Sequence, residues 1–299
     1  MAPDTTTPSH CPTPAMPSRA QFVRELTPPA LWNFSKHRLP WLVRALGGHF
    51  THIRFTGNYS SWEEARQAAT GYNAPAIVAK TREAALKVKH GQNRWEQDGM
   101  VSDSDAMPSA LLAALARIAA ANRRPELHVL DFGGSLGSTY FRCRPFFVPD
   151  FKLSWSVVEQ PEHVKIGQSD FQDNELRFHF TVEEALAAQP PDVLLLSSVL
   201  HYLDAPGAWL ENLRRWPIHN LIIDRTPLWE KDHHRLTVQH VPKEIYAASY
   251  PAWFLSRQKI FPLIERDYTL RWRAPDTETW EIDGDPVQNS LWLFERRWR

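Results

Sequence analysis

The chain has few of the features that would place it in a membrane, outside the cell or on nucleic acid. Its two cysteines, Cys11 and Cys143, are too few for a disulfide framework or a zinc site. No apolar run approaches the roughly 18 residues of a membrane-spanning helix, and the first residues are polar and proline-rich, unlike a signal peptide. The 34 Lys and Arg residues balance 34 Asp and Glu residues, so no general attraction to nucleic acid is expected. We therefore expect a cytoplasmic protein with no membrane span, no metal and no nucleic-acid partner.

The 299 residues, of which 43% are hydrophobic, are enough for one large domain or two small ones. Residues 1–18 are rich in Pro, Thr and Ser and are predicted to be a disordered tail. Residues 19–100 are predicted to be a helical N-terminal extension, with helices at 62–69 and 80–90. The remaining residues, 101–299, are predicted to form the main domain.

Apolar strand patterns alternate with helical patterns in the main domain, which predicts a parallel sheet with helices between the strands. A helix at 108–122 leads into the first strand. The predicted strands are 127–131, 154–159, 176–180, 192–197 and 219–224, and the predicted helices are 137–142, 161–167, 182–188 and 206–215. In the last part, residues 235–241, 262–273 and 290–296 are predicted to be antiparallel strands, and 243–256 a helix.

A glycine-rich turn follows the first of these strands. The apolar run ends in Asp131, and glycines then occupy positions 133, 134 and 137. Glycine lets the backbone approach a ligand closely and adopt positive φ, and the N–H groups at the following helix start can face that ligand. The pattern approximates the dinucleotide fingerprint G-x-G-x-x-G. It predicts a nucleotide site at the end of this strand.

A second acid strengthens that prediction. Glu159 ends the next apolar strand and stands 22 residues beyond Gly137. A ribose-binding acid is expected about 20 residues after the glycine turn, at the tip of the second strand. Strand, acid and spacing together indicate that Glu159 binds a ribose.

Other classes of protein share parts of this pattern. Residues 133–137 also fit G-x-S-x-G, which would make Ser135 the nucleophile of an α/β-hydrolase, although no run of buried strands precedes it. An NAD(P)-linked sugar oxidoreductase shares the turn and the acid, but no Tyr-x-x-x-Lys pair follows the fourth strand. A cofactor-binding subunit without catalysis is a third alternative.

Several longer motifs resemble one family. They are DFGGSLGSTYF at 131–141, VVEQ at 157–160, LLLSSVLHYL at 194–203, LIIDRTP at 221–227 and VQHVPKEIYAASYPAW at 238–253, with GNYSSWEEA at 57–65 and RWEQDG at 94–99 upstream. The chain resembles the class I methyltransferases that depend on S-adenosyl-L-methionine, and more closely a family associated with bacterial surface-polysaccharide gene clusters. The resemblance implies a Rossmann-like α/β fold with a mostly parallel seven-stranded sheet and helices on both faces.

The resemblance also implies roles for single residues. S-adenosyl-L-methionine is the expected cofactor, and polysaccharide biosynthesis the expected context. The turn and Asp131 would hold the amino-acid end of this cofactor, Glu159 would bind both of its ribose hydroxyls, and Gln160 would border its adenine. The full set of expected cofactor contacts is Asp131, Gly133, Gly134, Ser135, Gly137, Glu159, Gln160, Ser197 and Ser198.

Methyl transfer to a hydroxyl requires alignment of the acceptor and removal of its proton. Ligands of open α/β sheets bind beyond the carboxyl ends of the strands, where His201 and Asp224 are the predicted catalytic residues. Tyr202, Arg225, Tyr250 and Trp253 are the predicted acceptor-binding residues, the last two on the helix expected at 243–256. The expected partner is a small-molecule or glycan acceptor that is O-methylated.

Overall fold

In the computed structural model, the described residues are 53–299 except 71–73, 123–124, 243–244, 246–247 and 298–299. The predicted disordered tail and the first part of the predicted extension lie outside these residues. Residues 52–299 form one compact unit. The domain boundary predicted at residue 100 stays a prediction.

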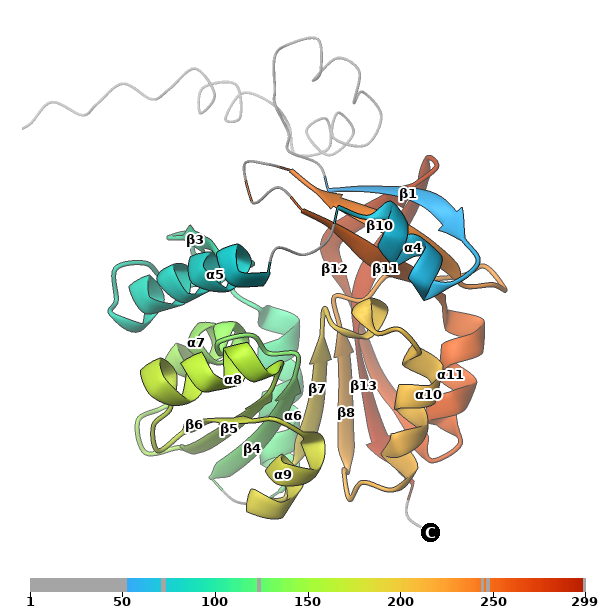
Figure 1. Cartoon of the computed structure of the whole chain (residues 1–299). Helices are drawn as coiled ribbons and strands as arrows, with labels where there is room; N and C mark the ends of the chain where they lie inside the picture. Colours follow the sequence, from blue (N-terminus) through green and yellow to red (C-terminus); the bar gives the residue numbers. More distant parts are fainter. Residues whose placement is uncertain (1–52, 71–73, 123–124, 243–244, 246–247, 298–299) are drawn as a thin grey trace, which may run out of the picture. The chain divides into compact units, whose positions relative to one another are not determined.

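A seven-stranded sheet forms the centre of this unit, in the order β12-β13-β8-β7-β4-β5-β6 (Figure 1). Strands β6, β5, β4, β7 and β8 run parallel to one another, and β13 runs antiparallel to β8. The strands are β4 (Glu126–Phe132), β5 (Lys152–Val158), β6 (Leu176–His179), β7 (Val193–Ser197), β8 (Asn220–Asp224), β12 (Tyr268–Ile282) and β13 (Asp285–Arg296). The predicted seven-stranded α/β sheet is confirmed, and it is mixed rather than purely parallel.

Two hydrophobic cores lie on opposite faces of the sheet because successive side chains of a strand alternate between its faces. In β4, Val129 belongs to one core and Leu130 to the other. The first core packs against α6 (Ser109–Ala121), α7 (Ser138–Cys143) and α8 (Pro161–Ile166); the second packs against α9 (Val182–Ala188), α10 (Pro206–Leu210) and α11 (Arg257–Glu265). The helices thus cover both faces, as predicted.

Short irregular helices connect several of these elements. They are η1 (Arg144–Phe146), η2 (Gly167–Phe171), η3 (Leu200–Tyr202) and η4 (Glu211–Arg214). The N-terminus of α9 is a capping box, in which Thr181 Oγ1 accepts from Glu184 N at 3.1 Å and Glu184 Oε2 accepts from Phe180 N at 2.9 Å. These reciprocal bonds explain why this helix begins where the sequence predicts.

The described part of the predicted extension contains both helices and strands. Its helices are α4 (Trp62–Ala68) and α5 (Ala74–Lys89), and its strands are β1 (Arg54–Tyr59), β2 (Trp95–Gln97) and β3 (Met100–Ser102). β2 and β3 form a hairpin. β1 belongs to a second sheet, in the order β1-β10-β11-β9, with β9 (Leu228–Trp229), β10 (Arg235–Val241) and β11 (Ala248–Ser256). The extension is therefore not purely helical.

Two predictions for the last part of the chain are wrong. Residues 248–256 form strand β11 instead of a helix, because they pair antiparallel with β10 along its full length. Residues 257–265, partly assigned to a strand, form helix α11, which buries Ile260, Phe261 and Ile264 against the sheet. The second sheet packs beside η3, and Trp253 Nε1 donates to O of Leu203, the residue after η3, at 3.1 Å. Figure 1 shows this sheet beyond the carboxyl ends of β7 and β8.

Candidate functional site at the carboxyl edge of the sheet

The glycine turn joins β4 to α7. Gly133 and Gly137 have φ of 76° and 90°, values that glycine adopts without strain. A Cβ at Gly134 would stand 2.6 Å from Asp131 Oδ2, so this position has no room for a side chain. The N–H groups of Gly134 and Ser135 donate to no other group among the described residues. Unpaired N–H groups of this kind are suited to a ligand.

Asp131 is the second-to-last residue of β4, beneath this turn, and is only 1% exposed. Its Oδ2 accepts from Trp155 Nε1 at 3.1 Å. Burial raises the pKa of the Asp131 carboxyl to about 7, with the nearby carboxylates of Glu159 and Asp224 adding to this and Arg225 opposing it. The structure thus brings together the acids at the ends of three strands.

Glu159 follows β5 directly and lies beside the turn, because Gly133 N donates to Val158 O at 2.9 Å. Burial raises the pKa of Glu159, and His163 on α8 opposes that shift. The backbone N–H of Gln160 donates to the Glu159 carboxylate. Among the described residues, no side chain donates a hydrogen bond to it. Gln160, the expected adenine neighbour, is the exposed N-cap residue of α8. A carboxylate without side-chain donors has the capacity to accept from two ribose hydroxyls.

The ends of β7 and β8 carry three linked side chains. Ser197 Oγ donates to Asp224 Oδ2 at 3.0 Å, and Arg225 Nε donates to Ser197 Oγ at 3.2 Å. Arg225 Nε also lies 3.9 Å from Asp224 Oδ2. Burial raises the pKa of Asp224, while Arg225 and Ser197 oppose the shift.

Three residues with strained backbone conformations lie at the same carboxyl edge of the sheet. Ser135, Ser198 and Arg225 have φ of 53°, 55° and 47°, and each follows a different parallel strand of the central sheet. Residues with a side chain rarely adopt such values, and strained positions cluster at functional sites. The strain supports a functional role for this edge, where the sequence had placed all three residues.

Tyr202 and Tyr250, two of the predicted acceptor residues, do lie together. Their rings form a T-shaped pair with centroids 5.4 Å apart. The buried amide of Gln239 links them, since Tyr202 Oη donates to Gln239 Oε1 at 2.8 Å and Gln239 Nε2 donates to Tyr250 Oη at 3.2 Å. This linkage fixes two half-buried aromatic rings next to η3.

Trp253 lies on the other face of β11 from Tyr250, because the two are three positions apart and side chains alternate between the faces of a strand. Its ring stacks near Trp62 of α4 at 6.3 Å, whereas Tyr250 faces Tyr202. The prediction that Tyr250 and Trp253 lie on one helix and line one pocket is therefore corrected, because they lie on opposite faces of a strand. Trp253 contributes packing between the second sheet and α4.

His201 is fully buried beneath Tyr202, with ring centroids 3.9 Å apart, and its ring also meets the edge of Trp280 at 5.0 Å. Neither ring nitrogen has a hydrogen-bond partner among the described residues. Burial, with a smaller contribution from Arg225, lowers the pKa of His201 to about 3. An enclosed imidazole of this kind is neutral at pH 7 and a weak base, so its placement does not support the predicted role as base.

Replacing His201 by phenylalanine is expected to reduce the loss of stability in acid. Because the folded-state pKa of about 3 lies below the ordinary 6.5, the unfolded chain takes up the proton first. This lowers the free energy of unfolding by up to about 1.4 kcal/mol for each pH unit below 6.5. Urea unfolding at pH 7 and pH 5 would show a shallower pH dependence for the variant by about 2 kcal/mol. The exposed His233, replaced in the same way, is the control, and equal pH dependence of wild type and His201→Phe would contradict the burial argument.

Two further charged residues near this edge were not predicted from the sequence as site residues. Glu96 of β2 is 3% exposed, and its carboxylate accepts from Ser138 Oγ and, at 3.2 Å, from Gly99 N. Arg142 of α7 lies over the Trp95 ring at 4.3 Å. Both belong to the attachment of the β2–β3 hairpin to α7. Only the family-like motif at 94–99 gave a signal for Glu96.

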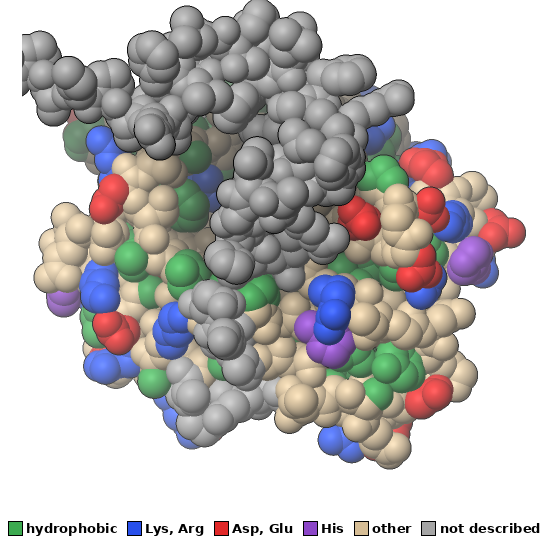
Figure 2. Space-filling view, turned by 90° about the horizontal axis from the view of Figure 1, so that it is seen from above, with side chains coloured by type: hydrophobic (Ala, Val, Ile, Leu, Met, Phe, Trp, Pro, Cys, Tyr) green, Lys and Arg blue, Asp and Glu red, His purple; other side chains and the backbone are tan. Residues whose placement is uncertain are grey.

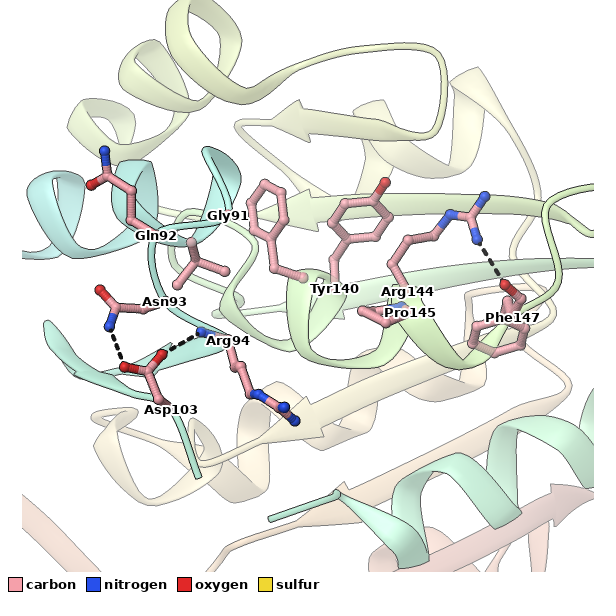
Figure 3. A pocket seen from close by; sticks show the side chains of 11 residues that line it. Gly91, Gln92, Asn93, Arg94, Asp103, Tyr140, Arg144, Pro145 and Phe147 are labelled. Atoms are coloured by element: carbon pink, nitrogen blue, oxygen red, sulfur yellow. Dashed lines mark hydrogen bonds between the residues drawn. The ribbon is translucent and has the colours of Figure 1, made fainter. Parts of the chain in front are cut away.

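A cavity of about 520 Å³ lies between the end of α5, the residues leading into β2, and α7 with η1 (Figure 3). No predicted site residue lines it, so this cavity is separate from the candidate site. Its polar groups largely bond one another: Asp103 accepts from Asn93 Nδ2 at 3.0 Å and from Arg94 N at 3.1 Å, and Arg144 donates to Phe147 O at 3.1 Å. These polar groups are therefore engaged within the chain.

The hydrolase alternative lacks a base near Ser135. Among the described residues, no histidine forms a hydrogen bond with its hydroxyl. The downstream histidines have other partners: His233 bonds Asp232, His234 Nδ1 accepts from Ser256 N, and His240 bonds Thr56. A nucleophilic serine requires an adjacent base, so the geometry does not favour this alternative.

On the face seen in Figure 2, basic and acidic side chains lie interspersed over the visible described surface. None of the described helices is long and apolar enough to cross a membrane.

Comparison with known proteins gives similarities of fold at low identity. No protein-family model matches the chain, and no curated protein matches it. Among solved structures, the N-terminal domain of EvdMO1, crystallised in the presence of SAH and D-fucose, shares 14% identity over 76% of this chain and 98% of that one, with a TM-score of 0.46. An S-adenosylmethionine-dependent methyltransferase from Clostridium acetobutylicum shares 10% identity over 73% and 99%, with a TM-score of 0.42. Similarities at this level carry no conclusion about the activity of this chain.

Proposed function

We propose that the protein is a methyltransferase that uses S-adenosyl-L-methionine. The observation that carries this proposal is the convergence of Asp131, Glu159 and Asp224 beside the glycine turn, each with a pKa raised by burial. Buried carboxylates are stabilised by a positive charge. S-adenosylmethionine is a cation through its sulfonium, whereas the pyrophosphate makes NAD(H) an anion. The electrostatics therefore favour the sulfonium cofactor over the dinucleotide.

The residues around the turn fit such a cofactor. Gly134 has no room for a side chain and has an unpaired N–H group, which suits close approach of the amino-acid end of the ligand. Glu159 would hold the ribose hydroxyls one strand away. The antiparallel β12–β13 hairpin also lies beside β8, at the position where a dinucleotide-binding sheet has its sixth parallel strand.

The acceptor would be O-methylated, and a sugar or glycan hydroxyl is the acceptor we propose. When bound, S-adenosylmethionine supplies an electrophilic methyl carbon. The protein must hold the acceptor oxygen in line with that carbon and take its proton. We propose that Asp224 Oδ1 accepts the proton of the acceptor hydroxyl, because Oδ2 already accepts a hydrogen bond from Ser197. The Tyr202–Tyr250 pair provides aromatic faces against which a sugar ring can stack.

Calorimetric titration of the full chain with S-adenosylhomocysteine and with NADH tests this proposal. We expect a measurable affinity for S-adenosylhomocysteine and none for NADH. S-adenosylhomocysteine is neutral overall and keeps both the ribose and the amino-acid end. Tight NADH binding without a response to S-adenosylhomocysteine would establish the oxidoreductase alternative instead.

Replacing Glu159 by alanine is expected to weaken the binding of S-adenosylhomocysteine at least tenfold, which corresponds to about 1.4 kcal/mol of binding free energy. The variant loses hydrogen bonds from two ribose hydroxyls to a charged acceptor, each contributing roughly 1.5–3 kcal/mol. Glu162→Ala, which removes an exposed acid of the helix α8 that follows Glu159, is the matched control for calorimetry. Unchanged affinity in a folded Glu159→Ala variant would remove Glu159 from the ribose site.

A further inference from the structure

The buried carboxylate of Glu96 lies at the glycine turn without an ion pair. It comes from the β2–β3 hairpin, outside the central sheet, and reaches Ser138, the first residue of α7. Ser138 Oγ and Gly99 N hold its two oxygens. Among the described residues, no basic side chain pairs with it. Burying an unpaired carboxylate is costly, so this position is suited to a cationic ligand.

Arg225 presents a complementary charge from the end of β8. Its Nε is fixed by Ser197, while its terminal guanidinium nitrogens donate to no group of the described chain. Its side chain is 22% exposed. Arg225 is close enough to lower the pKa values of both Glu96 and Asp131. Arg225 Nε reaches Ser197 at the end of β7, and β7 pairs with β4, whose following turn leads to Ser138 beside Glu96. The guanidinium and the Glu96 carboxylate therefore lie at the same edge of the sheet, yet they do not form a salt bridge with each other.

The hairpin that carries Glu96 is attached firmly to α7. The Arg142 guanidinium lies over the Trp95 ring, and Arg142 also donates to Ala106 O at 3.2 Å, beyond β3. These contacts, with the bond from Ser138 to Glu96, attach the hairpin to α7. Glu96 is thus positioned before any ligand arrives, which reduces the entropic cost of binding.

We propose that Glu96 and Arg225 together recognise the zwitterionic α-amino acid end of the cofactor. The Glu96 carboxylate accepts hydrogen bonds from the ammonium group, and the Arg225 guanidinium donates to the carboxylate. A single carbon separates these two groups in an α-amino acid, so one ligand can bridge an acid and a guanidinium that do not touch. This inference rests on the proposed methyltransferase function. It adds a specificity site built partly from the N-terminal extension.

The test compares S-adenosylhomocysteine with 5′-methylthioadenosine, which keeps the adenosine but lacks the amino-acid end. Full-length wild type, Glu96→Gln and Arg225→Met are titrated with each ligand by calorimetry. We expect each variant to bind S-adenosylhomocysteine at least tenfold more weakly than wild type. Its affinity for methylthioadenosine should stay within twofold of wild type. Arg94→Met, an exposed arginine just before the same hairpin, is the control and should change neither affinity.

The outcomes separate this inference from the proposed function. If wild type binds neither adenosine ligand, the proposed function fails and the inference fails with it. If wild type binds S-adenosylhomocysteine and Glu96→Gln leaves its affinity unchanged, only the inference is overturned. Equal weakening of both ligands would also overturn it, since that result indicates a structural role for Glu96. If Glu96→Gln does not fold, Glu96→Asp, which keeps the charge, replaces it in the test. It should lower the affinity for S-adenosylhomocysteine but not for methylthioadenosine.

Discussion

Replacing Asp224 by asparagine is expected to lower kcat for methyl transfer by about 10²–10⁴-fold, the usual contribution of a general base. Asparagine keeps the size of the side chain and can still accept from Ser197, but it cannot take a proton. Because the base acts on the acceptor, affinity for S-adenosylhomocysteine should stay close to wild type. Single-turnover transfer from labelled S-adenosylmethionine to fractionated glycans and metabolites measures the rate.

The pH profile provides a second measure of the same role. Burial raises the pKa of Asp224 above its ordinary 3.8, and a base acts in its deprotonated form. The rate should therefore rise with pH through that raised value in wild type, and the residual rate of Asp224→Asn should lack this limb. Asp204→Asn, an exposed acid after η3, is the control. A variant at position 224 that retains wild-type kcat would exclude Asp224 as the base.

The parallel part of the fold was predictable because its signals are local. Apolar runs mark β4 and β7, which are buried on both faces. The predicted helix at 182–188 likewise matches α9, which begins directly after its capping residue Thr181. Each of these patterns lies within a few residues of the element that it defines, so one sequence was sufficient.

The second sheet was mispredicted because its strands are determined by pairing across the chain. Tyr250, Trp253 and Phe254 fit helical spacing as well as a strand. Ladder pairing with β10 decides between them, for example Trp253 opposite Leu236 and Tyr250 opposite Gln239. Phe55 on β1, far away in sequence, packs edge to face with Phe254 at 4.9 Å. Such contacts override local propensity.

The candidate site shows the same division. Asp131 and Glu159 were found because a glycine turn and a strand end mark their positions in the sequence. Glu96 was not found, because a single acid between a tryptophan and a short turn has the same local pattern as an exposed residue. Only the packing of the hairpin on α7 buries it. His201 was overvalued for the converse reason, since no local pattern reveals that Tyr202 and Trp280 enclose its ring.

Replacing Asp131 by asparagine is expected to stabilise the ligand-free protein and to weaken cofactor binding. The folded-state pKa of about 7 lies above the ordinary 3.8. The stability that this group provides is thus present in acid and lost as pH rises through 7. At pH 8 the ionised, buried carboxylate costs the fold on the order of 2–4 kcal/mol. Asparagine, an isostere of the protonated acid that can still accept from Trp155, removes this cost.

Urea unfolding at pH 4 and pH 8 measures the first effect, with the exposed Asp150→Asn as control. The variant should gain stability at pH 8 and little at pH 4, so that its pH dependence becomes flatter than that of wild type. Calorimetry at pH 8 should show S-adenosylhomocysteine bound at least tenfold more weakly, because a charge-assisted interaction with its ammonium group is lost. A gain in stability together with a loss of affinity is expected where a buried charge serves binding at the expense of the fold. A variant that loses stability at pH 8 would show instead that the Asp131 carboxylate supports the turn itself.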